Sequence, residues 1–500
     1  MPGQPRRATA ARAAPPPGPY LVAGAGRAGE AAARALAARA EPGAIAVWSD
    51  VDWPPAPAVA QRLLELGATL LAGDEGLALL DGATPPRTLI KSPGLPMAAP
   101  LVQQSLARGL EVLDEAELGY RLDTRPIVAI TGTNGKSTTA ALTAAVLGAN
   151  GQSCVVAGNS TFGPPLCALA GHDADVVVAE LSSFQLEGCT TLRPAAALLT
   201  NLTDEHVVHH GSAAAYAAAK RSLFVRDGTR VDAAAVGIDQ DFGRALAAEL
   251  RAAGARVVTF GRHHEADRRL LAASWTLRAS QLTVAEGPGT RTLISRLVGE
   301  HNALNAVGAL ALADVLGIDV AIAAAAIAAA APLPGRFEAI SSDRGFDVVV
   351  DYAHNPDGLR RALASARAVT DTTGGALRVV CSALGFHGAD QARAMGAIAA
   401  ERADHLVLTT QRWRVGEPFG ELRPGLLAGA QSVRGAVPEV RGDRADAIGA
   451  ALRAACPGDV VMVLERGALT GPLYDADDRA VPFDDRAVVR ALLAEIAAEG

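Results

Sequence analysis

The organisation of this chain is clearest at Ile127-Val-Ala-Ile-Thr-Gly-Thr-Asn-Gly-Lys-Ser-Thr-Thr139. The first five of these residues are apolar or β-branched, which is typical of a buried strand. Gly132 and Gly135 allow the backbone to turn and to approach a ligand closely. A helix expected to begin near Lys136 directs its unpaired N–H groups at the same point. The stretch therefore predicts a phosphate-binding loop between a strand and a helix.

Individual residues of this loop have expected roles in nucleotide binding. Lys136 supplies a cation to the outer phosphates, and the hydroxyls of Ser137 and Thr138 are placed to ligate Mg²⁺. The usual phosphate-loop pattern requires glycine where this chain has Ile130, so a chance glycine loop before an ordinary helix is the alternative. The ATP-binding residues expected in the loop are Gly132, Thr133, Asn134, Gly135, Lys136, Ser137 and Thr138.

Length and composition restrict the class of protein. A chain of 500 residues indicates about three domains, and a net charge of -7 argues against a nucleic-acid surface. The 5 cysteines are scattered without C-x-x-C spacing, which favours a reduced, cytoplasmic protein. Residues 1–18 are expected to be a flexible tail. The apolar run Val320–Ala331 is shorter than the roughly 20 residues that span a membrane, so a buried helix is expected.

A second glycine motif lies near the start of the chain. Tyr20–Gly29 is a predicted strand followed by G-x-G-x-x-G, with glycines at Gly24, Gly26 and Gly29. Asp50 follows about 20 residues later, as in the dinucleotide-binding fingerprint. A nicotinamide-dependent oxidoreductase is the alternative that this motif raises. The second phosphate loop, farther along the chain, argues against it.

Three further segments place reactive side chains after the phosphate loop. Asp175–Glu180 is a predicted strand ending on a carboxylate, where a phosphate-loop enzyme is expected to ligate Mg²⁺. Leu198–His206 is another predicted strand that runs into polar residues. His206, His209 and His210 are close enough in sequence to suggest zinc, and a solvated loop is the alternative for the last two. Ala213–Lys220 predicts a helix ending on a lysine.

Several of these motifs resemble the Mur ligase family, the enzymes that add amino acids to peptidoglycan precursors. Thr131–Thr138 is similar to the ATP loop of that family, and Glu180-Leu-Ser-Ser-Phe-Gln-Leu-Glu187 closely matches its D-glutamate-adding branch. The resemblance implies an α/β fold with a central parallel sheet between two Rossmann-like domains. The implied boundaries are 19–122 for a UDP-substrate domain, 123–332 for an ATP-binding domain and 333–500 for an amino-acid-binding domain.

The resemblance also implies roles for single residues. Lys136, His206 and Lys220 would be catalytic, with Lys220 carbamylated because neutral lysine takes up CO₂ to become an anion. The implied metal ligands are Ser137, Glu180 and His206. Further contacts with ATP are implied for Asn305, Arg336 and Asp351. Substrate contacts are implied for Gly24, Gly26, Gly29, Asp50, Gly94, Asn159 and Ser182. His209 and His210 receive no role, and Val208 stands where the family often has aspartate.

The predicted third domain combines features of different branches. Asp351–Asp357 and Pro482–Arg486 resemble the diaminopimelate- or lysine-adding ligases, and the former also resembles cyanophycin synthetase. Their Asp-Asn-Pro-Arg motif is absent near Thr409–Arg414, and their Gly-Lys-Gly-His-Glu is replaced by Leu464–Leu469. The resemblance to the D-glutamate-adding branch is therefore limited to the first two domains.

The resemblance implies a ligase that uses ATP and two Mg²⁺ ions to add glutamate to UDP-N-acetylmuramoyl-L-alanine, and a monomeric cytoplasmic protein is expected. The side-chain carboxylate of a bound glutamate needs a cation beside it when it is buried. The candidates are Arg412, Arg414 and Arg466, and His387 stands near the position where the D-glutamate-adding branch has a lysine. L-glutamate or another amino acid is the alternative acceptor. A noncatalytic ligase-like subunit is a further alternative, although such subunits carry a four-cysteine zinc ribbon that this sequence lacks. No nucleic acid and no membrane insertion are expected.

Overall fold

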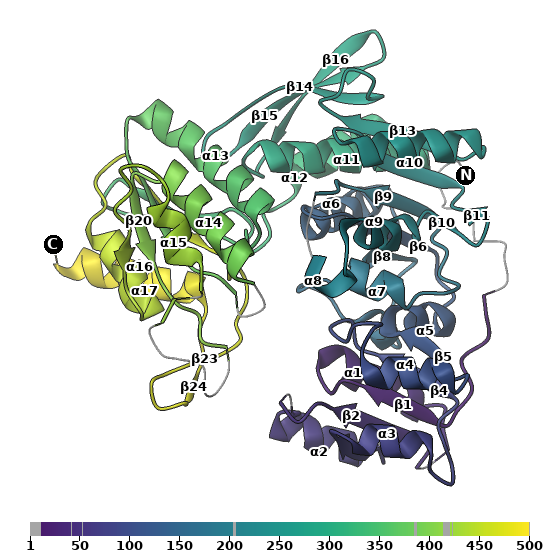
Figure 1. Ribbon diagram of the computed structural model, residues 1–500. Helices are drawn as coiled ribbons and strands as arrows, with labels where there is room; N and C mark the ends of the chain where they lie inside the picture. The colour runs from purple at the N-terminus through teal and green to yellow at the C-terminus, as the bar shows by residue number, and fades with distance from the viewer. Residues whose placement is uncertain are drawn as a thin grey trace. The chain divides into compact units, whose positions relative to one another are not determined.

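The computed structural model describes residues 12–41, 43–52, 54–203, 207–384, 388–413, 421–422 and 424–499. Strands and helices alternate through most of this part of the chain, which is an α/β fold (Figure 1). The chain divides into two compact units. The first unit contains Met1–Arg269 and Ala306–Ala326, and the second contains Leu270–Asn305 and Ile327–Gly500.

The first sheet has five parallel strands in the order β3-β2-β1-β4-β5. Its strands are β1 (Tyr20–Ala23), β2 (Ile45–Ser49), β3 (Thr69–Ala72), β4 (Thr88–Lys91) and β5 (Glu111–Asp114). Val22 packs in a core on one face, while its neighbour Leu21 packs in a core on the other. Burial of both faces explains the apolar strands. The helices are α1 (Arg27–Ala37), α2 (Pro57–Glu65), α3 (Glu75–Leu80), α4 (Pro100–Ala107) and α5 (Glu115–Leu122).

Buried polar contacts join the first sheet to the segment that follows it. The ammonium of Lys91 lies 3.2 Å from the Asp114 carboxylate and donates to the Phe184 carbonyl at 3.1 Å. The carboxylate of Glu117 accepts backbone N–H groups from Thr190, Thr191 and Leu192. Breaking these contacts would leave buried charges without partners, so the first sheet and the next form one unit.

The central sheet contains the strand that precedes the phosphate loop. Its parallel part has the order β13-β12-β9-β6-β8-β7. These strands are β6 (Ile127–Thr131), β7 (Cys154–Gly158), β8 (Val176–Glu180), β9 (Ala196–Leu199), β12 (Ala233–Gly237) and β13 (Arg256–Gly261). β6 is buried throughout and has β8 and β9 as neighbours, so the residues at the ends of these three strands lie together.

Helices and a short hairpin complete this part of the chain. They are α6 (Lys136–Ala149), the 3₁₀ helix η1 (Leu166–Ala168), α7 (Ser183–Glu187), α8 (Val207–His210), α9 (Ala213–Arg221), β10 (Val225–Arg226), β11 (Thr229–Arg230), α10 (Asp241–Ala252), α11 (Glu300–Leu316) and α12 (Val320–Ala329). An antiparallel extension of the sheet is formed by β14 (Arg268–Trp275), β15 (Ser280–Glu286) and β16 (Gly289–Ser295). None of the helices in the described ranges is long and apolar enough to cross a membrane.

The sheet of the second unit has the order β17-β18-β22-β19-β20-β21, in which only β17 is antiparallel to its neighbour. Its strands are β17 (Glu338–Ser341), β18 (Asp347–Asp351), β19 (Leu377–Cys381), β20 (His405–Leu408), β21 (Glu439–Val440) and β22 (Val460–Leu464). One face packs on α13 (Pro356–Thr373), α14 (Ala389–Arg402) and α15 (Leu426–Gln431). The other packs on α16 (Arg444–Arg453) and α17 (Asp485–Glu499). A small hairpin consists of β23 (Leu473–Tyr474) and β24 (Ala480–Val481).

Candidate active site

The phosphate loop connects β6 to α6. Gly132 has φ +145° and Gly135 has φ +86°, which are conformations that L side chains rarely adopt. A Cβ atom at Gly132 would lie 1.8 Å from the Thr200 hydroxyl, so only glycine fits there. Gly135 is the N-cap of α6, and the helix begins at Lys136 as the sequence predicts.

The end of β9 holds the loop in place. The backbone N–H of Asn134 donates to the side-chain oxygen of Asn201 at 3.0 Å, and the Asn201 amide donates back to the Asn134 carbonyl at 3.0 Å. The Thr200 hydroxyl donates to the same carbonyl at 2.7 Å. The loop is therefore shaped by protein contacts, as a preorganised phosphate site requires.

Two lysines converge on one carbonyl of this loop. Lys136 Nζ donates to the carbonyls of Gly132 at 3.1 Å and Thr133 at 2.8 Å. Lys220 Nζ donates to the Gly132 carbonyl at 2.8 Å from α9. The Lys220 residue is only 2% exposed, in contrast to an ordinary surface lysine. Two predicted catalytic residues, distant in sequence, thus lie at the phosphate loop.

Glu180 and Ser137 offer the oxygen ligands that Mg²⁺ prefers. Glu180 ends β8 and pairs in register with Ile130 of β6, so it lies beside the start of the loop. It is 3% exposed, and its Oε2 accepts no hydrogen bond from the described residues. A buried carboxylate oxygen without a donor fits a metal ligand better than a structural acid. The third predicted ligand, His206, lies outside the described residues.

Tyr216 belongs to this site although sequence reasoning gave it no role. Its hydroxyl lies 2.9 Å from the Thr133 hydroxyl, and its ring lies 4.8 Å from the Lys220 ammonium. Thr133 is also bonded through its hydroxyl to the Thr203 N–H at 3.0 Å. The available signal was the four-residue spacing of Tyr216 and Lys220, which places both on one helix face.

The predicted substrate residues of the first sheet form a tight glycine turn. Gly24 has φ +106°, and a Cβ at Gly29 would lie 1.7 Å from the Gly24 carbonyl oxygen. Gly26 is the N-cap of α1, so the helix terminus opens onto this turn. Asp50 and Gly94 are both exposed, and the Asp50 carboxylate accepts the Asp52 N–H at 3.1 Å.

Asn159 and Ser182 lie at the ends of β7 and β8. Asn159 is exposed, and its backbone N–H donates to the Glu180 carbonyl at 2.7 Å. Ser182 is the N-cap of α7, where its hydroxyl accepts the Gln185 N–H at 3.2 Å in a capping box. Asn159 therefore presents its side chain at the surface, whereas the Ser182 hydroxyl already has a structural role.

The other predicted ATP-binding residues belong to the second unit. Asn305 is 6% exposed, and its amide donates to the Asn302 side chain at 3.2 Å. The Asp351 carboxylate accepts the N–H groups of Phe337 at 2.7 Å and Ala353 at 2.8 Å. Burial raises the pKa of Asp351, while Arg336 and these donors lower it. The Arg336 guanidinium lies over the Tyr352 ring at 4.2 Å.

The structure describes two of the three arginines expected to bind an acceptor carboxylate. Arg412 pairs with the Asp478 carboxylate and donates to the Asp475 carbonyl. Arg466 is 0% exposed and donates through Nη2 to the carbonyls of Gly471 at 2.6 Å and Phe483 at 3.0 Å. Burial lowers the pKa of Arg466 to about 10, with a further contribution from Arg444. Both side chains thus already hold the segment around β23. Arg414 and His387 lie outside the described residues.

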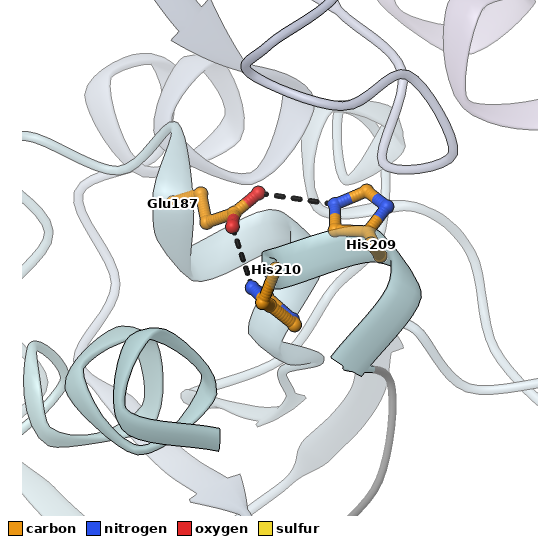
Figure 2. Close-up of side chains that lie close together, drawn as sticks. All are labelled: Glu187, His209 and His210. Atoms are coloured by element: carbon orange, nitrogen blue, oxygen red, sulfur yellow. Dashed lines mark hydrogen bonds and ion pairs between the residues drawn. The ribbon is translucent and has the colours of Figure 1, made fainter. Parts of the chain in front are cut away.

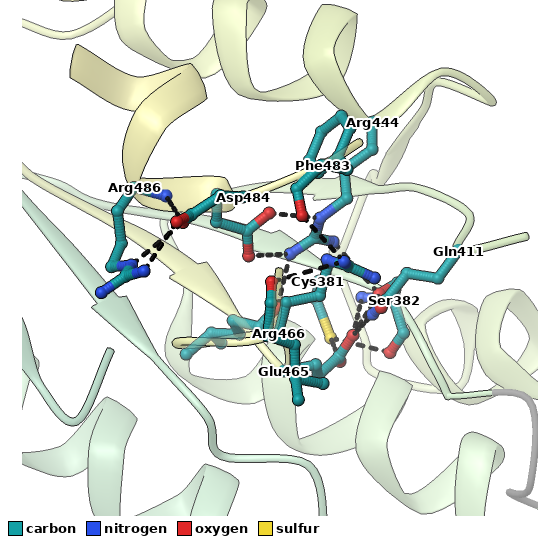
Figure 3. Close-up of polar contacts among 12 residues, drawn as sticks. Cys381, Ser382, Gln411, Arg444, Glu465, Arg466, Phe483, Asp484 and Arg486 are labelled. Carbon is teal, nitrogen blue, oxygen red and sulfur yellow. Dashed lines mark hydrogen bonds and ion pairs between the residues drawn. The ribbon is translucent and has the colours of Figure 1, made fainter. Parts of the chain in front are cut away.

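Next to Arg466 lies a buried polar cluster, here called the Glu465 cluster: Ser382, Gln411, Arg444, Glu465 and Asp485. Figure 3 shows the first four of these residues. The Glu465 carboxylate accepts the Ser382 N–H at 2.8 Å and the Gln411 amide at 3.1 Å. Arg444 donates to both oxygens of Asp485 at 2.8 and 2.7 Å. Burial raises the pKa of Glu465 to about 7, although Arg444 and the hydrogen bonds act in the opposite direction. The sequence indicated no such cluster: Leu464–Leu469 was notable only because it replaces the Gly-Lys-Gly-His-Glu motif.

Family models match the two regions that contain these residues. Residues 130–313 match the model described as Mur ligase middle domain, and residues 335–465 match Mur ligase, glutamate ligase domain. Crystal structures of UDP-N-acetylmuramate-alanine ligase from Thermotoga maritima and of MurF from Acinetobacter baumannii share the fold. Their TM-scores are 0.60 and 0.59 at 19% and 15% identity, and the matches cover 97% and 95% of this chain and 100% and 93% of those chains.

Two kinds of curated relative match the sequence. A UDP-N-acetylmuramoyl-L-alanyl-D-glutamate–2,6-diaminopimelate ligase from Acidovorax sp. (strain JS42) is 33% identical over 75% of this chain and 79% of the relative. A UDP-N-acetylmuramoylalanine–D-glutamate ligase from Streptococcus pneumoniae (strain P1031) is 34% identical over 60% of this chain and 63% of the relative.

The phosphate loop, its two lysines and the buried carboxylate have the arrangement of a nucleotide-phosphate site, and the matched families consist of ATP-dependent ligases that form carbon–nitrogen bonds. The two family models and the relative that is 33% identical over 75% of this chain show that this chain belongs to the Mur ligase family. The predicted family and α/β fold are thus confirmed.

Proposed function

We propose that this ligase joins glutamate to the carboxylate of UDP-N-acetylmuramoyl-L-alanine in peptidoglycan precursor synthesis. The observation that carries the proposal is the convergence of Lys136 and Lys220 on the Gly132 carbonyl. This carbonyl follows β6, and the neighbouring strand β8 leads into the segment Glu180–Glu187. That segment has the motif of the D-glutamate-adding branch, and several relatives named for this activity are 33% to 35% identical to the chain.

The proposed reaction has two steps. An oxygen of the substrate carboxylate attacks the γ-phosphorus of ATP, the bond to the β-phosphate oxygen breaks, and ADP leaves. The glutamate amine then attacks the acyl carbon, and phosphate leaves with that oxygen while the amine loses a proton. Lys136 would hold the transferred phosphate in line, because positioning and charge stabilisation supply most of the catalysis in phosphoryl transfer. Mg²⁺, held by Ser137, Glu180 and His206, would neutralise phosphate charge.

We further propose that Lys220 is carbamylated. It is buried, and its amine lies at the phosphate loop, where an anion in place of a cation would help to hold Mg²⁺. Lys220→Ala should lose activity and regain part of it with acetate, which replaces the carboxylate group. Incorporation of ¹³CO₂ on the wild-type protein would give a direct signal. An alanine variant with full activity and no ¹³C signal in the wild type would contradict the modification.

Acceptor choice is tested by ADP release with the nucleotide substrate and single amino acids. D-glutamate and L-glutamate are expected to support turnover better than diaminopimelate, lysine or aspartate. A clear preference for one of the other three would contradict the glutamate assignment. Arg412 and Arg466 each keep a buried N–H group without an acceptor among the described residues. If they hold the acceptor carboxylate, Arg412→Lys or Arg466→Lys should reduce glutamate selectivity, with the variant's thermal stability as the control for folding.

A further inference from the structure

A second group of metal-binding side chains lies outside the residues assigned to ATP. Glu187 ends α7, and the consecutive residues His209 and His210 belong to α8 (Figure 2). His209 Nε2 lies 3.1 Å from one Glu187 oxygen, and His210 Nδ1 lies 2.6 Å from the other. One ligand atom from each residue lies within 4.8 Å of the other two. Two imidazoles on one helix therefore face one carboxylate on another.

Neighbouring groups fix both rings. The second nitrogen of His210, Nε2, lies 2.9 Å from the Ser183 hydroxyl, and the His210 side chain is 0% exposed. The His209 ring packs on Phe184 with a centroid separation of 3.9 Å. Metal-binding histidines usually have a hydrogen-bond partner on the second ring nitrogen, which sets the ring orientation. Ser183 supplies that partner here.

We propose that Glu187, His209 and His210 form a binding site for a first-row transition ion, with Zn²⁺ as its representative. Two imidazoles and one carboxylate are ligands that Zn²⁺ accepts, with the fourth tetrahedral position left to water. Zinc–nitrogen bonds of about 2.0–2.1 Å place tetrahedral ligands roughly 3.3 Å apart. The two nitrogen–carboxylate separations, 2.6 and 3.1 Å, are shorter than this, and the three ligand atoms all lie within 4.8 Å of one another, so the side chains are close enough to surround one ion after adjustment.

Proton positions are compatible with both the metal-free and the metal-bound state. Without the ion, His209 and His210 can donate to Glu187, and His210 Nε2 then accepts from the Ser183 hydroxyl. With the ion, the facing nitrogens must present lone pairs, so the His210 proton resides on Nε2 and is donated to Ser183. A hydroxyl can donate or accept, and therefore Ser183 satisfies both states.

A bound ion would link the two helices near the phosphate loop. α7 begins three residues after Glu180, and α8 follows His206 directly in the sequence. The His210 ring lies 5.3 Å from the Tyr216 ring, and Tyr216 is in turn bonded to Thr133 of the loop. Occupancy of this site is thus expected to stabilise the first unit. The inference does not depend on which amino acid the ligase adds.

The chain also supplies a matched comparison site. His263, His264 and Glu265 form another group of three potential ligands, but His264 and Glu265 are exposed. His263 pairs with Glu265 at 3.9 Å. All three residues are consecutive in the connection between β13 and β14, so no second element of the fold contributes a ligand to this group. His264→Gln is therefore the control for nonspecific binding by surface histidines.

The test uses the full-length protein equilibrated with Zn²⁺ in the presence of excess Mg²⁺, which competes with zinc for the metal site proposed at Ser137, Glu180 and His206. Bound zinc is measured by mass spectrometry after dialysis, and affinity by a chelator competition. Wild type and His264→Gln should each retain one zinc ion per chain. His209→Gln and Glu187→Gln should bind at least about tenfold more weakly, because loss of even an outer-shell partner costs that much.

Two further measurements keep the result interpretable. Far-ultraviolet circular dichroism without metal shows whether each variant is folded, and Ser183→Ala keeps all three ligands while removing the ring's partner. Co²⁺ should give a visible ligand-field spectrum with wild type that is absent in His209→Gln. Equal zinc retention by wild type and His209→Gln, or loss of zinc on His264→Gln, would overturn the proposal. So would a wild-type protein that retains no zinc.

Discussion

The phosphate loop of the first unit and the Glu465 cluster of the second hold cationic side chains in different ways. At the loop, Lys136 and Lys220 donate to a neutral backbone carbonyl of Gly132. In the cluster, Arg444 donates to a carboxylate of Asp485, and both side chains are at most 1% exposed. Removing a cation that is matched by a buried anion leaves that anion unpaired and destabilises the fold, whereas a cation held at a phosphate loop can interact with a ligand. The same kind of mutation should therefore affect stability in one region and activity in the other.

The largest expected effect on stability comes from Arg444→Met. This change leaves the buried Asp485 carboxylate without its partner and should lower the free energy of unfolding by about 3–5 kcal/mol. Urea denaturation followed by circular dichroism measures it. The control is Arg486→Met, which breaks the more exposed pair with Asp484 and should cost about 1 kcal/mol or less. Equal losses for the two variants would remove the distinction between the cluster and a surface ion pair.

Lys136→Ala should produce the complementary result. Loss of this charge at the loop should lower ADP release about 100- to 1000-fold, since a single preorganised electrostatic contact contributes that much. The unfolding free energy should change by less than about 1 kcal/mol, because the side chain is not part of an apolar core. Steady-state kinetics and urea denaturation on the same preparation measure both. More than a tenth of wild-type turnover would contradict the phosphate-loop assignment.

Glu465→Gln tests whether the Glu465 carboxyl makes the free energy of unfolding depend on pH. The pKa of Glu465 is raised from 4.5 to about 7 by burial, so between these values the folded protein keeps a proton that the unfolded chain releases. The group's contribution to stability is therefore fully present below about pH 4.5 and is lost as the pH rises through about 7. Wild type should lose roughly 1.4 kcal/mol more per pH unit than Glu465→Gln within this window. If the unfolding free energies of wild type and Glu465→Gln, measured by urea titration, change in parallel with pH, the raised pKa of Glu465 is contradicted.

The smallest effect is expected for Tyr216→Phe. This variant removes only the hydroxyl that lies 2.9 Å from the Thr133 hydroxyl, at a cost of about 1 kcal/mol. Because Thr133 belongs to the loop, ADP release should also fall, by less than tenfold. Tyr20→Phe is the control, since its hydroxyl donates to the Pro16 carbonyl at 3.0 Å in the first sheet. A loss of turnover with Tyr20→Phe and none with Tyr216→Phe would contradict the proposed link.

Local patterns in the sequence predicted the elements that carry the phosphate loop. The strand at Ile127–Thr131 and the helix beginning at Lys136 have the expected bounds, because apolar β-branched residues and glycine act over a few positions. The fold class and family followed from motifs of this kind. The roles assigned to His206, Lys220 and the arginines in binding and catalysis stay predictions.

Contacts between distant residues were not predictable in the same way. Arg444 and Asp485 are 41 positions apart, and Ser382 and Glu465 are 83 apart. No periodicity links such residues, and their pairing depends on the strand order of the sheet. Tyr216 could have been noticed from its spacing to Lys220, but its partner Thr133 lies 83 positions earlier. Polar groups that meet only through tertiary structure leave no local signal.

The backbone at Glu465 has a consequence for how this protein can change by mutation. Glu465 has φ +85°, a conformation in which glycine is favoured over any residue with a side chain. Glycine there would relax the backbone but would remove the acceptor for Ser382 and Gln411 and the negative charge beside Arg444. A single change to glycine would therefore improve the backbone only by breaking the polar network. Positions 465 and 444 should therefore show strong epistasis, such that Glu465→Gly is tolerated only together with a compensating change at Arg444.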